Sequence, residues 1–341
     1  MQVEVNIRQV PLDGVVAAAR TLEEAGVDII SDAEVRRDPL LTMAALATAT
    51  ERVHLATAIS IAFARSPMVF AYAARNLHDL SGGRFHLGLG TQVKRHIQRR
   101  FSAEWGAPGP HLRDVVQAIR DIWATWEQGV PLEHQSEHFT IDLMNPEFDL
   151  GPSAFGPVPL ELAAVNRYNL GLAARRAEAV RLHVFSTPRF VREVARPRLD
   201  EAAAADGRDP ATLTVVGGGF VATGATEEQV HAAREQARSR VAFYGSTRTY
   251  RPVLEVHGWE ELNTDLRSLA DQGRWDDMAG IMPDDVLDEF VSAGTYDEIA
   301  GTVHTRYGGV VDRVQLPWPA GDPGAADWDG FSRAVAGLQG R

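Results

Sequence analysis

Apolar and polar positions follow two alternating periods along the chain. Short apolar runs of strand length are each followed by a segment with apolar residues at helical spacing, and this order continues from one end to the other. The pattern is typical of parallel βα units. It predicts strands at residues 3–7, 27–31, 53–60, 85–90, 159–165, 179–185, 213–221 and 311–316. Eight such units are the number that closes a TIM (β/α)8 barrel.

One unit, from Ala56 to Gln92, has an unusual inner surface. In its first predicted strand large residues alternate with small ones, so one face, which includes Ala58 and Ser60, is almost bare. A flat ring could lie against such a face. Ser66 with Pro67 then predicts the start of a helix. The unit therefore indicates an enzyme of the flavin type.

Five stretches of the chain carry a family resemblance. In chain order they are LEEAGVDIISDAE, DPLLTMAALATATERVHLATAI, FARSPM, LSGGRFHLGLGTQVKRHIQRRF and AFYGSTRTYRPVLEVHGW. Their order and spacing resemble the luciferase-like family of flavin- and deazaflavin-dependent oxidoreductases, most closely its actinobacterial coenzyme F420 branch. The resemblance covers most of the chain. It implies a TIM-type barrel with a reduced flavin or deazaflavin at its mouth and redox chemistry on a small organic substrate.

Composition narrows the class of protein. With 341 residues, 45% of them apolar and 23% charged, we expect one barrel domain over residues 1–341. The formal net charge of −12 disfavours nucleic acid and anionic membranes as partners. The absence of cysteine excludes disulfides and iron–sulfur ligation, so redox chemistry requires an organic cofactor. The N-terminal segment lacks a signal-peptide pattern, and a cytoplasmic location is expected.

Three stretches are too long for simple connections between barrel elements. We expect insertions at about residues 91–110, 133–157 and 244–283 on the carboxyl face of the strands, the second with a short hairpin around 139–143 and the third irregular. His134 and His138 in the second insertion are expected in an exposed polar turn, and no metal site is predicted.

Candidate chemistry lies at the carboxyl ends of the strands, because barrels bind their ligands there. Asp32 is the first candidate for a catalytic residue, since a carboxylate beside an apolar pocket can have its pKa raised towards working pH. The alternative is a helix cap or an ion pair with Arg36 or Arg37. Related F420-dependent dehydrogenases often have histidine after this aspartate, whereas this chain has Ala33. Glu34 is the candidate to replace it as acid or base.

The resemblance also implies cofactor contacts. Family members carry a non-proline cis peptide at the end of the third strand, which matches Ala58 and Ile59 here; the alternative is an ordinary trans strand. Thr91 and Gln92, after the fourth strand, match positions close to the cofactor. The phosphate-binding turn of relatives matches the segment 165–167.

Within that turn, Val165, Asn166 and Arg167 replace the usual glycines. Asn166 can still cap the following helix, and Arg167 can contact a phosphate. Phe63 and Arg65, beyond the third strand, are expected to contact substrate.

A late loop combines Tyr244, Tyr250 and Arg251. These residues are expected to bind substrate, the aromatic rings covering a planar ligand and Arg251 taking an anionic group. The alternative is a packed surface loop in which Arg251 pairs with Glu255.

The leading hypothesis is an F420-dependent oxidoreductase that transfers hydride to or from a small organic substrate. One alternative is a two-component monooxygenase that uses reduced FMN and oxygen, with a flavin or F420 reductase as partner. The alternative of another class is a non-catalytic barrel subunit. A homodimer is expected, for which Met43, Leu46 and residues 68–72 offer apolar area.

Overall fold

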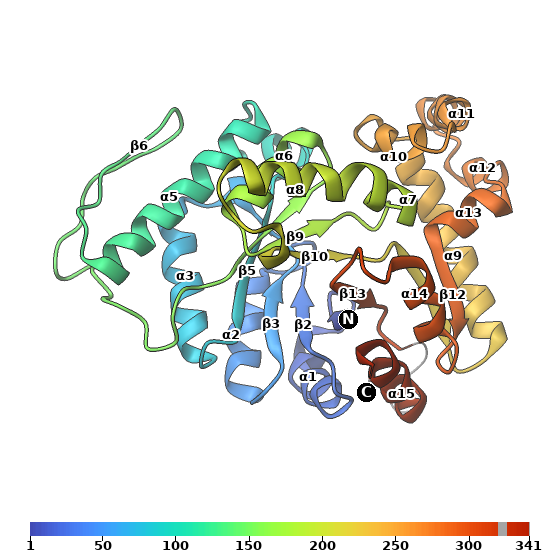
Figure 1. Ribbon diagram of the computed structural model, residues 1–341, viewed down its shortest axis with the longest axis horizontal. Helices are drawn as coiled ribbons and strands as arrows, with labels where there is room; N and C mark the ends of the chain where they lie inside the picture. Colours follow the sequence, from blue (N-terminus) through green and yellow to red (C-terminus); the bar gives the residue numbers. More distant parts are fainter. Residues whose placement is uncertain (320–325, 341) are drawn as a thin grey trace.

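The strands close into one parallel barrel (Figure 1). The structure is a computed structural model and describes residues 1–319 and 326–340. Each barrel strand is hydrogen-bonded to the next along the chain, and the last pairs with the first, which confirms the predicted (β/α)8 barrel. In chain order the strands are β1 (Gln2–Asn6), β2 (Ile29–Asp32), β3 (His54–Thr57) with its continuation β4 (Ser60–Ile61), β5 (Phe85–Gly90), β8 (Leu160–Ala164), β9 (Ala179–Leu182), β10 (Thr214–Gly217) and β13 (Arg313–Leu316).

Helices surround the barrel, and their ends follow local chemistry. Ser66 caps its helix as predicted, because its side chain accepts a hydrogen bond from the Val69 amide and Pro67 follows it. The longer covering helices are α1 (Val15–Glu24), α2 (Pro39–Ala49), α3 (Pro67–Leu80), α5 (Pro108–Gln128), α6 (Arg167–Arg176), α8 (Arg196–Ala205), α9 (Glu227–Gly245), α14 (Ile299–Tyr307) and α15 (Trp328–Gln339). No helix in the described part of the chain is both long and apolar enough to cross a membrane.

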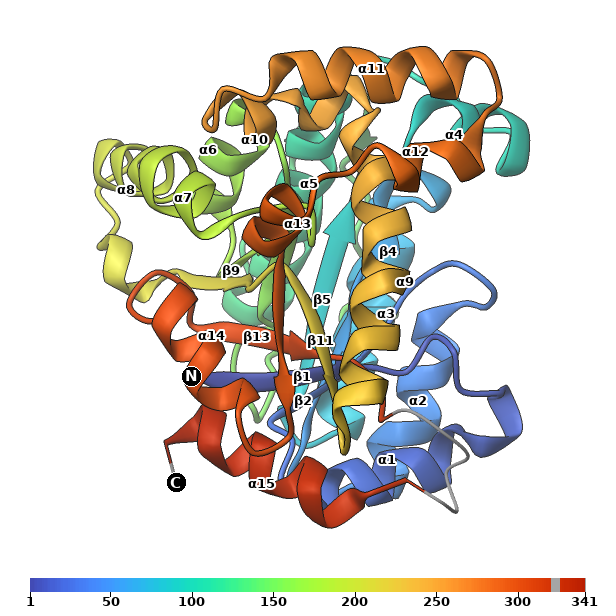
Figure 2. The ribbon, with the colours of Figure 1, turned by 90° about the vertical axis from the view of Figure 1, so that its right-hand side faces the viewer.

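The prediction of a single seventh strand at 213–221 is wrong, because the structure has two separate strands there. The barrel strand β10 ends at Gly217, and β11 (Phe220–Gly224) then pairs with β12 (Val291–Thr295) in a separate parallel sheet beside α9 (Figure 2). The chain changes sheets at Gly219, whose φ is +65°. A Cβ atom there would lie 2.5 Å from the Tyr307 hydroxyl, so glycine is required by both conformation and space.

The three segments predicted to be insertions contain regular structure. The first holds α4 (Lys94–Arg100), and the second forms a hairpin of β6 (His134–Gln135) and β7 (Thr140–Ile141) at the left edge of Figure 1. The third is largely helical rather than irregular, with α10 (Arg251–Glu255), α11 (Glu260–Asp271) and α12 (Trp275–Gly280), followed by α13 (Asp284–Phe290). The short α7 (Pro188–Phe190) precedes α8.

The two hairpin histidines are not in an exposed polar turn. His134 is buried and lies 2.7 Å from an Asp121 carboxylate oxygen, and His138 lies 2.8 Å from Asp114. Both aspartates belong to α5, so these contacts attach the hairpin to that helix. The expectation was wrong because it took the hairpin by itself, without the helix against which it packs.

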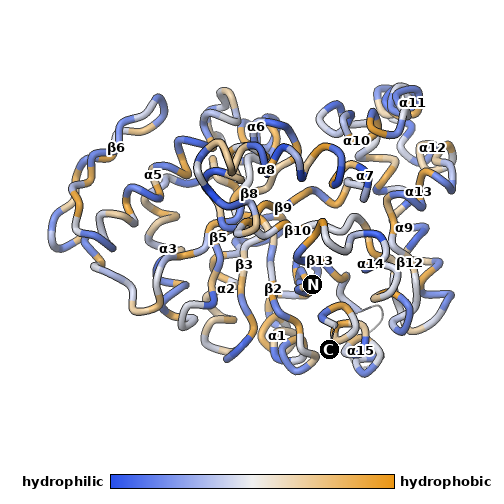
Figure 3. The backbone as a smooth tube through the Cα atoms, in the orientation of Figure 1, coloured by the Kyte–Doolittle hydropathy of each residue, from blue (hydrophilic) through white to orange (hydrophobic). Residues whose placement is uncertain are grey.

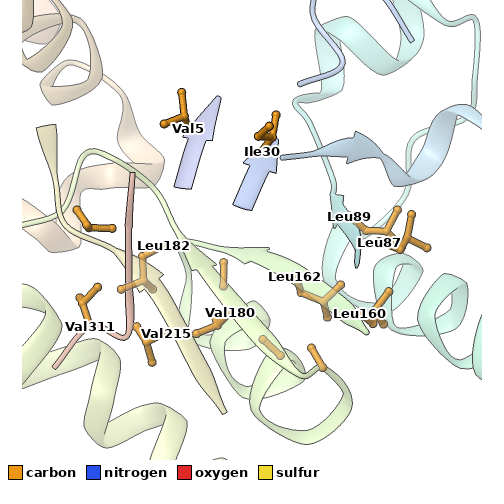
Figure 4. Close-up of a cluster of buried hydrophobic side chains, with 14 of the residues drawn as sticks. Val5, Ile30, Leu87, Leu89, Leu160, Leu162, Val180, Leu182, Val215 and Val311 are labelled. Carbon is orange, nitrogen blue, oxygen red and sulfur yellow. The ribbon is translucent and has the colours of Figure 1, made fainter. Parts of the chain in front are cut away.

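Apolar strand residues face the surrounding helices and form the core (Figure 4). Val5, Leu160, Leu162 and Val180 belong to this layer, and Figure 3 shows apolar segments along the central strands with hydrophilic stretches on the outer helices. Alternation along each strand therefore turns the intervening residues into the barrel.

Several of these inward residues are charged. Arg181 donates from Nε to Glu161 Oε2 at 2.6 Å and from Nη2 to Glu4 Oε2 at 2.7 Å, while Arg313 Nη1 donates to Glu161 Oε1 at 2.8 Å. Both carboxylates are fully buried. Burial alone would raise the pKa of the Glu161 carboxyl, but the guanidinium groups and His86 hold that pKa well below its usual value. Paired charges thus fill the barrel interior below the mouth.

Candidate active site at the barrel mouth

A cavity of about 530 Å³ opens at the carboxyl ends of the strands. Ligands of TIM barrels bind at this face, so the cavity is the candidate active site. Its lining comes from several strand ends and from α9: Asn6, Arg8, Gln9, Ala58, Ile59, Ala163, Ala164, Val165, Arg181, Leu182, His183, Val184, Gly219, Phe220, Val221, Gln236, Arg240, Tyr244, Gln315, Leu316, Pro317 and Trp318.

The Ala58–Ile59 segment forms one wall between β3 and β4. Its peptide bond is cis, as the resemblance implies. The alternation of large and small residues does not continue through this break, because Ala56 and Ser60 are fully buried while Ala58 and Ile59 both line the cavity. Of the bare face predicted along the strand, only Ala58 lines the cavity, and Ile59, predicted on the opposite face, lines it as well.

The loop after β2 holds this wall in place. The Ala58 amide donates to the Asp32 carbonyl oxygen at 2.7 Å, and the Glu34 amide donates to the Ile59 carbonyl oxygen at 3.1 Å. The Glu34 side chain also accepts from the Ile61 amide at 2.7 Å. Residues 32 to 34 thus bond to the segment on both sides of the cis peptide.

The carboxylates of Asp32 and Glu34 are both paired with arginine. Arg37 Nε donates to Asp32 Oδ2 at 2.6 Å, and Arg65 contacts Glu34 at 2.8 Å. Both carboxylates are buried, and neither side chain lines the cavity. The ion pair with Arg37 is the alternative left open for Asp32 in the sequence. The catalytic roles of Asp32 and Glu34 stay predictions.

Of the three cofactor candidates after β8, only Val165 lies at the cavity. Val165 lines it, whereas the Asn166 side chain caps α6 by accepting from the Asn169 amide at 2.9 Å. Arg167 is exposed and lies 3.4 Å from Glu201.

Thr91 and Gln92 follow β5 and bond locally. Thr91 Oγ1 donates to the Gln92 carbonyl oxygen at 3.2 Å, and Gln92 has a positive φ of 56°. Neither residue lines the cavity.

Two substrate candidates near the third strand lie away from the cavity lining. Phe63 is buried and stacks on His111 with ring centroids 4.1 Å apart. Arg65 bridges Glu34 and Asp38, with 2.8 Å to each. Burial lowers the pKa of His111 to about 4, with a smaller contribution from His138, so the Phe63–His111 stack is uncharged at neutral pH.

The late aromatic loop does reach the cavity. Tyr244 lines it, and the rings of Tyr244 and Tyr250 both lie 4.5 Å from the ring of His183, which follows β9. Burial lowers the pKa of His183 to about 4, with a further contribution from Arg240, so this imidazole is neutral at pH 7. Arg251 instead pairs with Glu255 at 2.8 Å on the surface.

Several lining residues were not predicted from the sequence. Arg8 lies two residues after β1, and Gln315 to Trp318 follow or end β13, so the strand-end rule that selected Asp32 could also have found them. Arg240 sits within α9 and has no comparable signal. His183 follows β9 directly and could have been found in the same way.

Comparisons with known proteins agree with this architecture. The family model described as luciferase-like monooxygenase matches residues 2–313. A protein of Mycobacterium tuberculosis with no assigned function is 40% identical over 298 residues, 87% of each chain. Another protein of that species, provisionally named a coenzyme F420-dependent oxidoreductase, is 27% identical over 320 residues, covering 83% of this chain and 84% of its own. The coenzyme F420-dependent tetrahydromethanopterin reductase of Methanopyrus kandleri has a similar fold, with a TM-score of 0.77, 18% identity and coverage of 98% and 97%.

Proposed function

Because the chain belongs to the luciferase-like monooxygenase family, we propose that it is an oxidoreductase that uses coenzyme F420 for hydride transfer with a small organic substrate. The observation that carries the proposal is the cavity bounded by Ala58, Ile59 and Val165 at the carboxyl ends of the strands. The relative that is provisionally named as F420-dependent supports the choice of cofactor.

The cavity residues fit such a cofactor. Ala58, Ala163 and Ala164 have short side chains and leave room for a flat ring beside Ile59. Gly90 supports this wall from behind, because a Cβ atom there would lie 2.9 Å from the Ile59 side chain. When bound, a deazaflavin or flavin supplies the electron chemistry, and the protein binds, orients and shields it.

In this proposal the residues of the chain have distinct tasks. Asp32 and Glu34 position the Ala58–Ile59 wall through their backbone bonds, since their carboxylates are held by arginine. Tyr244, packed beside the neutral His183, lines the cavity and helps to exclude water from it. Val165, just after β8, also lines the cavity and would contact the bound ligand.

The second candidate is a monooxygenase that uses reduced FMN and oxygen, with a flavin reductase as partner. The family description favours it, because it names luciferase-like monooxygenases. Titration of the purified protein with F420 and with FMN, each oxidised and reduced, tests the two. Tight binding of F420 with weak FMN binding is the expected result, and binding of FMN alone would exclude the F420 proposal.

We also propose that the protein is a homodimer, but with an interface that differs from the one expected from the sequence. Met43 and Leu46 cannot form the interface, since both are fully buried within the protomer. The exposed apolar side chains on α2 and α3 are instead Leu41, Val69 and Leu80. Light scattering should give twice the 37.2 kDa of the chain, and a mass of one chain at micromolar concentration would refute the dimer.

A further inference from the structure

Two arginines at the cavity have no opposite charge beside them. Arg8 follows β1 and Arg240 lies on α9; both line the cavity and both remain exposed to it. Neither forms an ion pair within residues 1–319 and 326–340. Two other arginines near the strand ends are paired: Arg37 with Asp32, and Arg65 with Glu34 and Asp38.

The rest of the cavity wall does not neutralise them. Among the described residues, no carboxylate side chain lines the cavity. Arg181, at its floor, already has Glu4 and Glu161 as partners, and His183 is uncharged at neutral pH. The described part of the mouth is therefore locally positive, although the whole chain carries a formal charge of −12.

The two guanidinium groups also act on each other. Although the Arg8 side chain is exposed to the cavity, desolvation by the surrounding wall lowers its pKa, and the positive charge of Arg240 lowers that pKa further. Arg240 is held 5.0 Å from the centre of the Phe220 ring, whose face favours a cation and restricts where the side chain can go. Two like charges at one cavity repel each other, and an anion bound between them would offset this repulsion by attracting both.

We propose that Arg8 and Arg240 together bind an anionic oxygen group, a carboxylate or a phosphate, of the molecule that occupies the barrel mouth. Guanidinium groups suit such anions because their N–H donors match two oxygens at once. The inference rests on the proposed function in taking the cavity as the ligand site. The anion has two sources: an acidic substrate, or the phosphate of the cofactor.

The test compares Arg8→Gln and Arg240→Gln with the parent and with Arg333→Gln. Arg333 is the matched control because it is exposed on α15, does not line the cavity, and pairs with Asp297 alone among the described residues. Calorimetry measures binding of FMN against riboflavin, and of F420 against the same deazaflavin without its phosphate. Benzoate against benzyl alcohol, titrated into each protein, tests a free organic acid in the same way.

Loss of a charge-assisted hydrogen bond should weaken anion binding about ten- to hundredfold in each of the two variants. If the phosphate of the cofactor is the anion, FMN and F420 weaken while their phosphate-free forms do not. If an acidic substrate is the anion, cofactor binding is unchanged and benzoate binding is lost, with benzyl alcohol unaffected.

The proposal is overturned if both variants bind every anion as tightly as Arg333→Gln does. Failure of the proposed function looks different. The parent would then bind neither F420 nor FMN, while a loss of benzoate binding confined to Arg8→Gln and Arg240→Gln would still establish the anion site.

Discussion

Replacing Glu161 with glutamine removes one of the two carboxylates in the charged interior of the barrel. The Glu161 carboxylate accepts from Arg181 Nε at 2.6 Å, from Arg313 Nη1 at 2.8 Å, and lies 2.9 Å from His86 Nδ1. Glutamine has nearly the same volume, so no cavity forms. Two buried guanidinium groups would then share Glu4 alone.

Breaking a buried pair in this way costs about 3–5 kcal/mol of unfolding free energy, because the remaining charge stays buried without its partner. This is a large part of the 5–15 kcal/mol that typically separates folded from unfolded protein. Urea unfolding at pH 7, followed by circular dichroism, should show a lower midpoint for Glu161→Gln than for the parent.

The matched control is Asp277→Asn. Its ion pair with Arg274 has the same distance of 2.6 Å, but the two side chains are 53% and 55% exposed, so solvent screens it and the loss should not exceed about 1 kcal/mol. If Glu161→Gln loses no more stability than Asp277→Asn, the reasoning about the barrel interior is refuted. Should Glu161→Gln not fold, Glu161→Asp, which keeps the charge, should fold and be intermediate in stability.

Three other perturbations have defined outcomes. Ala58→Leu places branched bulk at the cavity wall and should weaken F420 or FMN binding, measured by titration, far more than it lowers the urea midpoint without cofactor. His183 has its pKa lowered from 6.5 to about 4, so the unfolded chain binds the extra proton first and stability is lost as the pH falls below 6.5. His183→Asn should therefore lose less stability between pH 7 and pH 5, by urea midpoints at each pH. Gly273→Ala, at φ +73° with open space around the added Cβ, should cost about 1–2 kcal/mol of unfolding free energy. Gly219→Ala should cost more, because its φ is +65° and the added Cβ would also lie 2.5 Å from the Tyr307 hydroxyl.

Each of these has a contradicting result. Equal cofactor affinity in the parent and Ala58→Leu would remove that wall from the site. An unchanged pH dependence in His183→Asn would show that the imidazole titrates alike in folded and unfolded chains. Equal losses in the two glycine variants would show that the packing around Gly219 adjusts at no cost.

The barrel could be predicted from the sequence because each strand is apolar over its own few residues and each helix has its own periodic face. The seventh strand could not be placed in this way. Its second half pairs with β12, about 70 residues further on, and a local pattern does not contain that partner. The prediction for the hairpin histidines was wrong for the same reason, since their partners Asp114 and Asp121 belong to α5.

The site could be predicted in outline but not in its electrostatics. The strand-end rule and the family resemblance together gave Ala58 and Ile59, and the resemblance gave Val165; all three line the cavity. The sequence left open whether Asp32 is a catalytic carboxylate or the partner of an arginine, because an arginine five residues further on can reach it in the sequence pattern but need not. What fixes Arg37 on Asp32 is that it also donates to the carbonyl oxygens of residues 7 and 10, in the loop after β1. That contact joins two segments whose proximity exists only in the closed barrel.

The charged interior also determines which cations at the mouth are available to a ligand. Arg181 belongs to both regions, since it lines the cavity floor and bonds to Glu4 and Glu161 below it. Both of its partners are fully buried, so the guanidinium group is fixed and its charge is compensated from beneath. A guanidinium held in this way cannot turn upwards to follow an anion without leaving two buried carboxylates short of a partner. Among the described residues that line the cavity, Arg8 and Arg240 are therefore the two arginines that no carboxylate of the wall restrains.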